Sequence, residues 1–246
     1  MDKAMYIGMN GAKNTMAAQT VHANNLANAS TTGFRGNLAN AQAKPFEGVG
    51  FDTRVYNTIE SSPTDFSQGA LMETGNELDV AIAGEGFIAV QTADGGEAYT
   101  RAGDFQLSAF GELLTGGGLP VLGNAGPIAI PPNQKIEIGA DGTISVREQG
   151  QGAESITAFE RIKLVNPDVT QMTKGLDGLI RMNDGAFALP AAEVRLQAGF
   201  LESSNVNVVD SMVEMISLTR NYELNIKLIK SVEENSETSA RLLQVQ

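Results

Sequence analysis

The chain has 246 residues, of which 42% are apolar and 6% aromatic, with no cysteine and a formal net charge of −12. This length suffices to bury a hydrophobic core, and the absence of cysteine excludes disulfides and thiolate metal sites. The acidic balance and the scattered lysines and arginines exclude nucleic-acid binding, which requires a basic surface.

The first predicted element is a helix over residues 3–28, a stretch without proline. Its apolar residues recur at intervals of three, four or seven, the spacing with which one helix meets another. These residues are Met5, Met9, Ala12, Met16, Ala23 and Leu26. Gly33 then suits the left-handed backbone that ends such a segment. Periodicity alone leaves open whether this helix faces an ordinary core or pairs with a second helix.

The sequence pattern in the middle of the chain predicts strands. Residues 36–69 show little periodicity and indicate an extended connector with one strand around Thr53–Ile59. In residues 70–200, short apolar runs alternate with glycine-containing turns. Apolar alternation on both sides of Asp141-Gly142 predicts a hairpin. We expect an irregular antiparallel β-rich domain.

The longest periodic segment is residues 207–245, which predicts a helix of roughly 55–60 Å. Its stripe has alternating spacings of four and three and consists of Val208, Met212, Met215, Thr219, Tyr222, Ile226 and Ile229. Asn205 or Asn207 is suited to cap this helix, and Asp210 suits the positive end of its dipole. The helix is longer than a body of residues 70–200 needs to cover itself.

Few residues indicate chemistry. The one histidine, His22, lies inside the N-terminal helix, where a polar helix position explains it without a catalytic role. Gly84 and Gly86 imitate a dinucleotide fingerprint, but a strand pattern follows where a phosphate-binding helix would have to begin. We interpret these glycines as a hairpin. No catalytic residue, cofactor or metal site is predicted, since the nearby carboxylates lack calcium-loop spacing.

Three motifs stand out along the chain. The first is residues 22–35, HANNLANASTTGFR. The second consists of the runs LDVAIAGEGF at 78–87 and YTRAGDF at 99–105, and the third of GFLESSNV at 199–206 and RNYE at 220–223. In this order they resemble the N-terminal signature, the central domain and the C-terminal motif of the bacterial flagellar rod and hook protein family. The length, the opening residues and the absence of tryptophan favour the proximal rod type over the distal rod type.

The resemblance implies an α+β fold, in which N- and C-terminal helices form a coiled-coil-like core domain beside an irregular antiparallel β-rich central domain. The expected segments are 1–35 (N-terminal helical core), 36–69 (extended connector), 70–204 (β-rich central domain) and 205–246 (C-terminal helical core). The family forms a hollow tube, so the resemblance implies a structural, non-enzymatic subunit. Such a subunit assembles helically, transmits torque and surrounds the export channel.

The predicted site is therefore an assembly interface. We expect the N-terminal apolar residues to pack against the C-terminal stripe of the same or an adjacent subunit. We expect the asparagines to satisfy partners at crowded helix contacts and Phe34 to anchor the exit from the helix. The residues are Met5, Met9, Met16, Asn24, Asn25, Leu26, Asn28, Phe34, Met212, Met215, Tyr222, Ile226 and Ile229.

The implied partners are other copies of the chain, the proximal and distal rod proteins and the flagellar type III export apparatus. The opening residues lack the features of a cleaved secretory signal, and no run of about 18 apolar residues predicts membrane insertion. We expect export without a cleaved signal peptide to the basal-body rod in the periplasm. Two rival interpretations are a β-rich carbohydrate-acting enzyme and a soluble binding module with a dimerising coiled coil.

Overall fold

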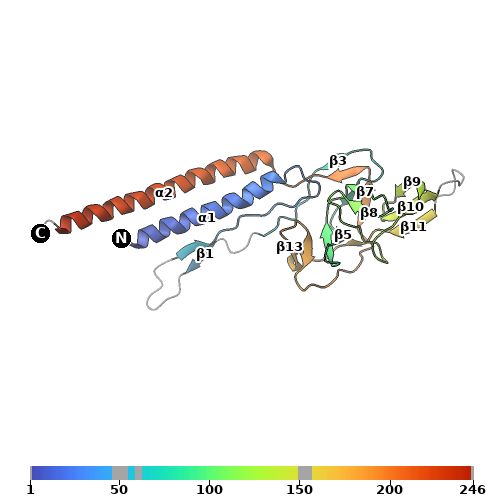
Figure 1. Cartoon of the computed structure of the whole chain (residues 1–246), viewed down its shortest axis with the longest axis horizontal. Helices are drawn as coiled ribbons and strands as arrows, with labels where there is room; N and C mark the ends of the chain where they lie inside the picture. Colours follow the sequence, from blue (N-terminus) through green and yellow to red (C-terminus); the bar gives the residue numbers. More distant parts are fainter. Residues whose placement is uncertain (1, 46–54, 59–62, 149–156, 245–246) are drawn as a thin grey trace. The chain divides into compact units, whose positions relative to one another are not determined.

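The structure, a computed structural model, describes residues 2–45, 55–58, 63–148 and 157–244. A long helix lies near each end of the chain and short strands lie between them (Figure 1). The elements are α1 (Asp2–Ala27), β1 (Gln42–Pro45), β2 (Val55–Thr58), β3 (Leu71–Glu73), β4 (Val80–Ala83), β5 (Phe87–Gln91), β6 (Glu97–Thr100), β7 (Phe105–Leu107), β8 (Leu113–Thr115), β9 (Asn133–Ile138), β10 (Thr143–Glu148), β11 (Thr157–Arg161), β12 (Leu164–Val165), the 3-10 helix η1 (Val169–Gln171), β13 (Met172–Lys174), β14 (Ile180–Met182), β15 (Arg195–Ala198), β16 (Phe200–Glu202) and α2 (Val208–Gln244).

The chain divides into two compact units. The helical unit contains residues 1–28, 37–65 and 206–246, and the β unit contains residues 29–36 and 66–205. The fold class is therefore α+β, as predicted.

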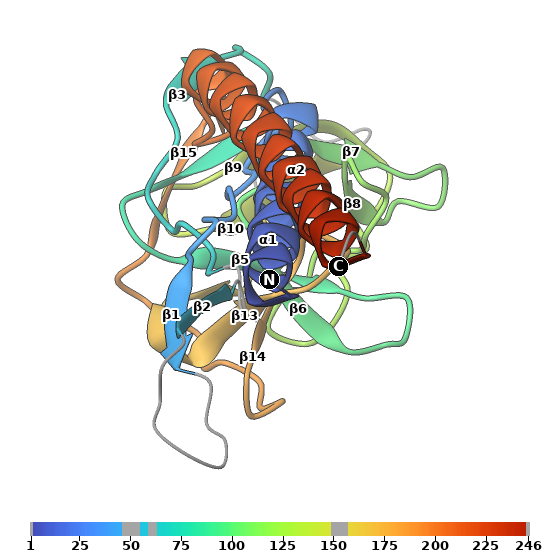
Figure 2. The same cartoon turned by 90° about the vertical axis from the view of Figure 1, so that its left-hand side faces the viewer.

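In the helical unit, α1 and α2 run side by side in opposite directions (Figures 1 and 2). Asn207 caps α2, as predicted, because its Oδ1 accepts hydrogen bonds from the backbone N–H of Val209 at 3.0 Å and of Asp210 at 3.4 Å. The strands β1 and β2 pair antiparallel. The strand β2 was expected, whereas β1 was not, because Gln42–Pro45 shows no apolar alternation.

In the β unit, one sheet has the order β12-β5-β6-β14-β13 and another the order β11-β10-β9. The remaining strands form the pairs β15-β4, β16-β3 and β7-β8, and the register of every described pair is antiparallel. The main hydrophobic core contains residues from both ends of this unit, including Val80 and Leu196. The early and late strands of the unit thus close one core together.

Two turn predictions had opposite outcomes. The hairpin around Asp141-Gly142 is confirmed, since β9 and β10 pair with Ile138 opposite Ile144. The hairpin at Gly84 and Gly86 was wrong, because β4 pairs with β15 while β5 pairs with β6 and β12. These glycines instead link strands of two different sheets. The strand β5 follows them directly, so no helix opens there to bind a phosphate.

Candidate assembly interface

The two helices of the helical unit meet through small residues on α1. Gly8, Ala12 and Ala18 are buried. A Cβ atom placed on Gly8 would lie 2.9 Å from Cγ1 of Ile229 and 3.0 Å from Cδ2 of Leu228. At this separation the α2 side chains pack directly on the α1 backbone, so the contact within the chain has no space for long α1 side chains.

The predicted methionines of α1 point away from this contact. Met5, Met9 and Met16 are 38%, 55% and 60% exposed, while Leu26 is half-buried. Within this chain, therefore, α2 does not cover Met9 or Met16. Their packing against an adjacent copy stays a prediction.

The predicted stripe of α2 is divided between two environments. Met215, Tyr222, Ile226 and Ile229 are half-buried, whereas Met212 is 49% exposed. Several further apolar residues of α2 are exposed and were not predicted: Val209, Val213, Ile216, Leu224 and Leu228. The four-three spacing describes a single face of the helix, so it missed these residues on other faces.

The predicted asparagines have different surroundings. Asn25 is buried, donates to the carbonyl of Asn37 at 2.7 Å and accepts from the Asn37 backbone N–H at 2.9 Å. This side chain therefore satisfies both backbone groups of Asn37 and stabilises the helical unit itself. Asn28 donates to the carbonyl of Asn24 at 2.9 Å, and the Asn24 side chain is exposed.

Two asparagines outside the prediction also bind backbone. The side chains of Asn10 and Asn14 both donate to the carbonyl of Asn57 on β2. They attach the β1–β2 pair to α1, a role that no periodic pattern in the sequence indicated.

Phe34 belongs to the β unit, where it is half-buried. The Lys174 ammonium lies 3.6 Å from the centroid of its ring and donates to the carbonyl of Arg35 at 2.6 Å. Burial lowers the pKa of Lys174 from 10.5 to about 8. Just before Phe34, Gly33 has the predicted left-handed backbone, with a φ of +66°, but it does not end the helix, because α1 already ends at Ala27. Phe34 therefore packs within the β unit, and its predicted role in anchoring the exit from the helix stays a prediction.

A buried ion cluster joins segments from all three motifs. Glu202 is 1% exposed, and its carboxylate accepts from Nη2 of Arg35 at 2.6 Å, from Nη1 of Arg101 at 2.9 Å and from the backbone N–H of Gly69 at 2.8 Å. Arg101 also donates to the carbonyl of Gly84 at 2.7 Å. One carboxylate thus holds two guanidinium groups from segments far apart in sequence.

This ion cluster was not predicted as a site. Its three charged residues lie inside the motifs that carry the family resemblance. Their place in these motifs was the one feature of the sequence that could have indicated the cluster. Pairing between residues 35, 101 and 202 could not be derived from spacing, because their partners are set by the closed β unit.

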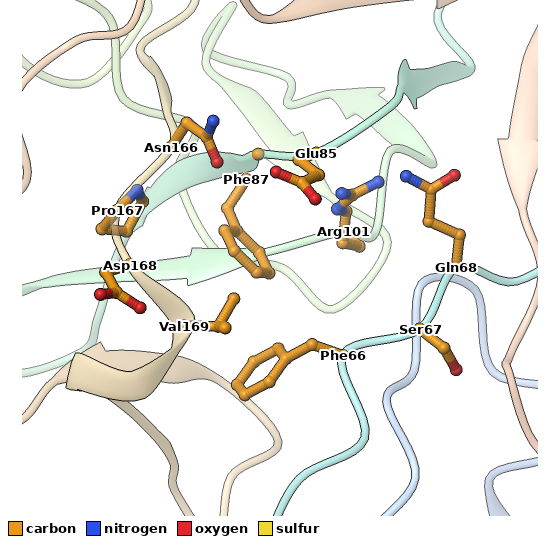
Figure 3. Close-up of a pocket in the computed structure, with 11 residues that line it drawn as sticks. Phe66, Ser67, Gln68, Glu85, Phe87, Arg101, Asn166, Pro167, Asp168 and Val169 are labelled. Carbon is orange, nitrogen blue, oxygen red and sulfur yellow. The ribbon is translucent and has the colours of Figure 1, made fainter.

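The β unit also contains a pocket of about 590 Å³ (Figure 3). Phe66, Phe87 and Val169 supply apolar lining, and the Arg101 guanidinium lies 5.4 Å from the centroid of the Phe87 ring. Glu85 and Asp168 also line the pocket. Hydrogen bonds from the backbone N–H and hydroxyl of Thr170 lower the pKa of Asp168, so this carboxyl is poorly suited to donate a proton.

In the described ranges, no group of three or more His, Asp or Glu residues is placed to hold a metal ion. Neither described helix combines the length and the apolar character needed to cross a bilayer.

Three family models match the chain, in sequence order. The model for flagella basal body rod proteins matches residues 5–35. The model for the flagellar hook protein FlgE/F/G D1 domain matches residues 81–146, and the model for the flagellar basal body rod FlgEFG protein C-terminal region matches residues 197–242.

Several curated proteins are similar to the chain along its length. It is 41% identical to the flagellar basal-body rod protein FlgF of Escherichia coli (strain K12), over 100% of both chains. It is 34% identical to FlgF of Caulobacter vibrioides, over 99% of this chain and 98% of the relative. It is 32% identical to the flagellar basal-body rod protein FlgG of Bacillus subtilis (strain 168), over 95% of this chain and 96% of the relative.

Proposed function

The chain belongs to the flagellar basal-body rod protein family, and on this premise we propose that it is a structural subunit of the proximal rod. It assembles helically with other copies of itself and with other rod proteins. The resemblance of its three motifs to the family is confirmed. The proximal type is favoured over the distal type because identity reaches 41% and 39% to two FlgF proteins and 34% to a FlgG.

The observation that carries this proposal is the exposed apolar surface on both helices. Met9, Met16, Met212 and Ile216 are each about half exposed or more. Burying the exposed half of one such side chain against a neighbour stabilises an assembly by roughly half of the 1.5–3 kcal/mol that complete burial gives, before the costs of ordering are subtracted. Met9 and Met16 are seven residues apart and Met212 and Ile216 are four apart, so each pair lies on one face of its helix. Exposed apolar residues grouped on one helix face are typical of a protein that binds other chains.

The helices supply the inner part of the assembly in this proposal. Copies contact one another through unlike surfaces, and such heterologous contacts build open helical tubes instead of closed dimers. The helices of neighbouring copies then form a coiled-coil-like core around the export channel, and the packed tube transmits torque. Export proceeds through the flagellar type III apparatus into the periplasmic part of the basal body, without a cleaved signal peptide.

We propose no catalysis. The relatives are named as rod proteins, and an enzyme acting on carbohydrate would need a pair of carboxyl groups of which one donates a proton. In the pocket, hydrogen bonds from Thr170 lower the pKa of Asp168, which disfavours this carboxyl as the proton donor.

A truncation tests the role of α2. Removing Ser231–Gln246 should leave the β unit folded but abolish incorporation into the rod and motility, because it deletes helix that extends past the start of α1. Circular dichroism would report folding, and immunoblots of isolated basal bodies would report incorporation. Arg241→Gln is the matched control, since it removes only an exposed ion pair with Glu237. Normal motility of the truncated chain would contradict the proposal.

A second measurement separates the two rod types. Gold labelling of a tagged chain along isolated rods should mark the part next to the base. Labelling at the end next to the hook would instead identify the distal type.

A further inference from the structure

The pocket of the β unit has binding capacity that its own unit does not use. Phe66, Phe87 and Val169 lie around the same hollow as Arg101 (Figure 3). The Arg101 guanidinium binds Glu202 through Nη1 and the Gly84 carbonyl through Nη2. Each of these nitrogens carries a second N–H that a further acceptor can use. The pocket therefore fits a group that combines an apolar ring with a nearby carboxylate.

The same unit presents such a combination at the turn between β7 and β8. Phe110 is 90% exposed, and its neighbours Ala109 and Gly111 are small. The turn is ordered by Ser108, whose carbonyl accepts from the Gly111 N–H at 2.9 Å and whose N–H donates to the Glu112 carbonyl at 2.9 Å. Glu112 is exposed and forms no ion pair within the part of the chain that the structure describes.

We propose that residues 108–112 of one copy dock into this pocket of a second copy. The Phe110 ring packs against Phe66 and Phe87, and the Glu112 carboxylate binds the guanidinium of Arg101. The two pocket rings are already edge to face, with centroids 6.1 Å apart and an interplanar angle of 83°, and a third ring extends this arrangement.

The geometry of a single chain makes this contact open-ended. Phe110 is exposed, so it does not fill the pocket of its own chain. The aromatic turn and the pocket are different surfaces of one unit, and each copy keeps one of them free after binding through the other. Such a contact repeats from copy to copy and adds a contact between β units to the helix contacts of the proposed function.

Among the described residues of the β unit, Phe187 is the next most exposed ring, at 66%, and the acid near it, Asp184, accepts the backbone N–H of Ala186 at 2.9 Å. The turn at Leu176 also presents a fully exposed apolar residue. Its side chain has no ring to stack in the pocket. The adjacent acid, Asp177, is already bound by both terminal nitrogens of Arg181, at 3.0 and 2.5 Å. It therefore has no free carboxylate for Arg101, whereas Glu112 does.

Glu85 opposes the incoming acid. It lines the pocket and lies beside Arg101 in Figure 3. Because like charges repel, the Glu112 carboxylate should bind more tightly once Glu85 is neutral. This gives the two glutamates opposite effects on the same contact.

Cysteine cross-linking tests the contact directly, since the chain has no cysteine of its own. The inference rests on the proposed function, so the test uses basal bodies from cells in which the full-length variant replaces the normal chain. Ala109→Cys and Gln68→Cys place thiols beside the turn and at the pocket, and leave Phe110 and the pocket rings intact. Treatment with a short bis-maleimide should give a ladder of multimers of this chain. Either cysteine alone should give none.

Phe110→Ser in this double-cysteine background should reduce the ladder at least about tenfold, the effect expected for losing a central aromatic anchor. Leu176→Ser is the matched control and should leave the ladder unchanged. Thermal unfolding of both variants should match the parent, because both side chains are exposed. Glu112→Gln should lower the yield of the ladder and Glu85→Gln should raise it.

The inference is overturned if the incorporated double-cysteine chain gives no ladder, or if its only adducts are with other proteins. A ladder that survives Phe110→Ser would also overturn it, and so would glutamate effects of the reverse sign. Absence of the cysteine-free chain from basal bodies would remove the proposed function, and this inference with it. Incorporation without the ladder removes the inference alone.

Discussion

The two units of this chain treat their apolar residues in opposite ways. In the β unit, Ile88, Ile144 and Val165 are completely buried. In the helical unit, Met9, Met16 and Ile216 are more than half exposed. The β unit thus closes a core by itself, whereas the helical unit leaves much of its apolar surface for other chains. Stability and assembly can therefore be altered separately, by substitutions in different units.

The largest expected effect is on the stability of the β unit. Glu202→Gln should lower its free energy of unfolding by about 3–5 kcal/mol, because two buried guanidinium groups lose the carboxylate between them. Thermal and urea unfolding of the full chain would measure this loss. Glu137→Gln, which removes only an exposed ion pair with Lys135, should leave the midpoint unchanged. An equal response to both substitutions would show that the cluster does not hold the unit together.

A smaller loss is expected from Gly33→Ala. A Cβ atom at this position would lie 2.3 Å from the carbonyl carbon of Arg101, and the backbone is left-handed. We expect a loss of about 2–3 kcal/mol, since the conformational penalty adds to the cost of forcing a methyl group into packed backbone. Gly95→Ala is the control, because that glycine is also left-handed but has no neighbour within 4 Å of the added atom. Equal losses in urea unfolding would mean that Gly33 matters only for its backbone angle.

The smallest expected effect on stability comes from Met16→Ser in the helical unit. This side chain is 60% exposed, so the free energy of unfolding of the isolated chain should change by no more than about 0.5 kcal/mol. Incorporation into basal bodies should nevertheless fall, because the exposed methionine is proposed to pack against a neighbouring copy. A large loss of stability, or unchanged incorporation, would remove the distinction between the two units.

Sequence patterns predicted the elements that depend on local chemistry. Asn207 at the start of α2, the Asp141-Gly142 hairpin and left-handed Gly33 each follow from the preferences of a few adjacent residues. The fold class and the family followed from the order of helix, strands and helix and from the three motifs.

Contacts between distant segments could not be predicted in the same way. The strand β4 pairs with β15 and not with β5, which no local turn signal specifies. The α1 face that meets α2 contains Gly8 and Gly11. Small residues stand there because the two helix backbones approach closely, and this closeness is not visible in the apolar pattern of the sequence. The apolar periodicity of residues 3–28 gives most weight to large apolar residues. It therefore predicted that the methionines, and not the glycines, would form the contact between the helices.

The pairing of β3 with β16 and of β4 with β15 has a consequence for the timing of folding. Val80 and Ile82 pack in the same core as Val194 and Leu196, so a chain emerging from its N-terminus lacks part of that core until residue 196 has appeared. Closing a loop of so many residues is slow relative to forming contacts between neighbouring segments. A partly emerged chain should therefore remain unfolded over these strands and complete the core of the β unit only after residue 196 has emerged.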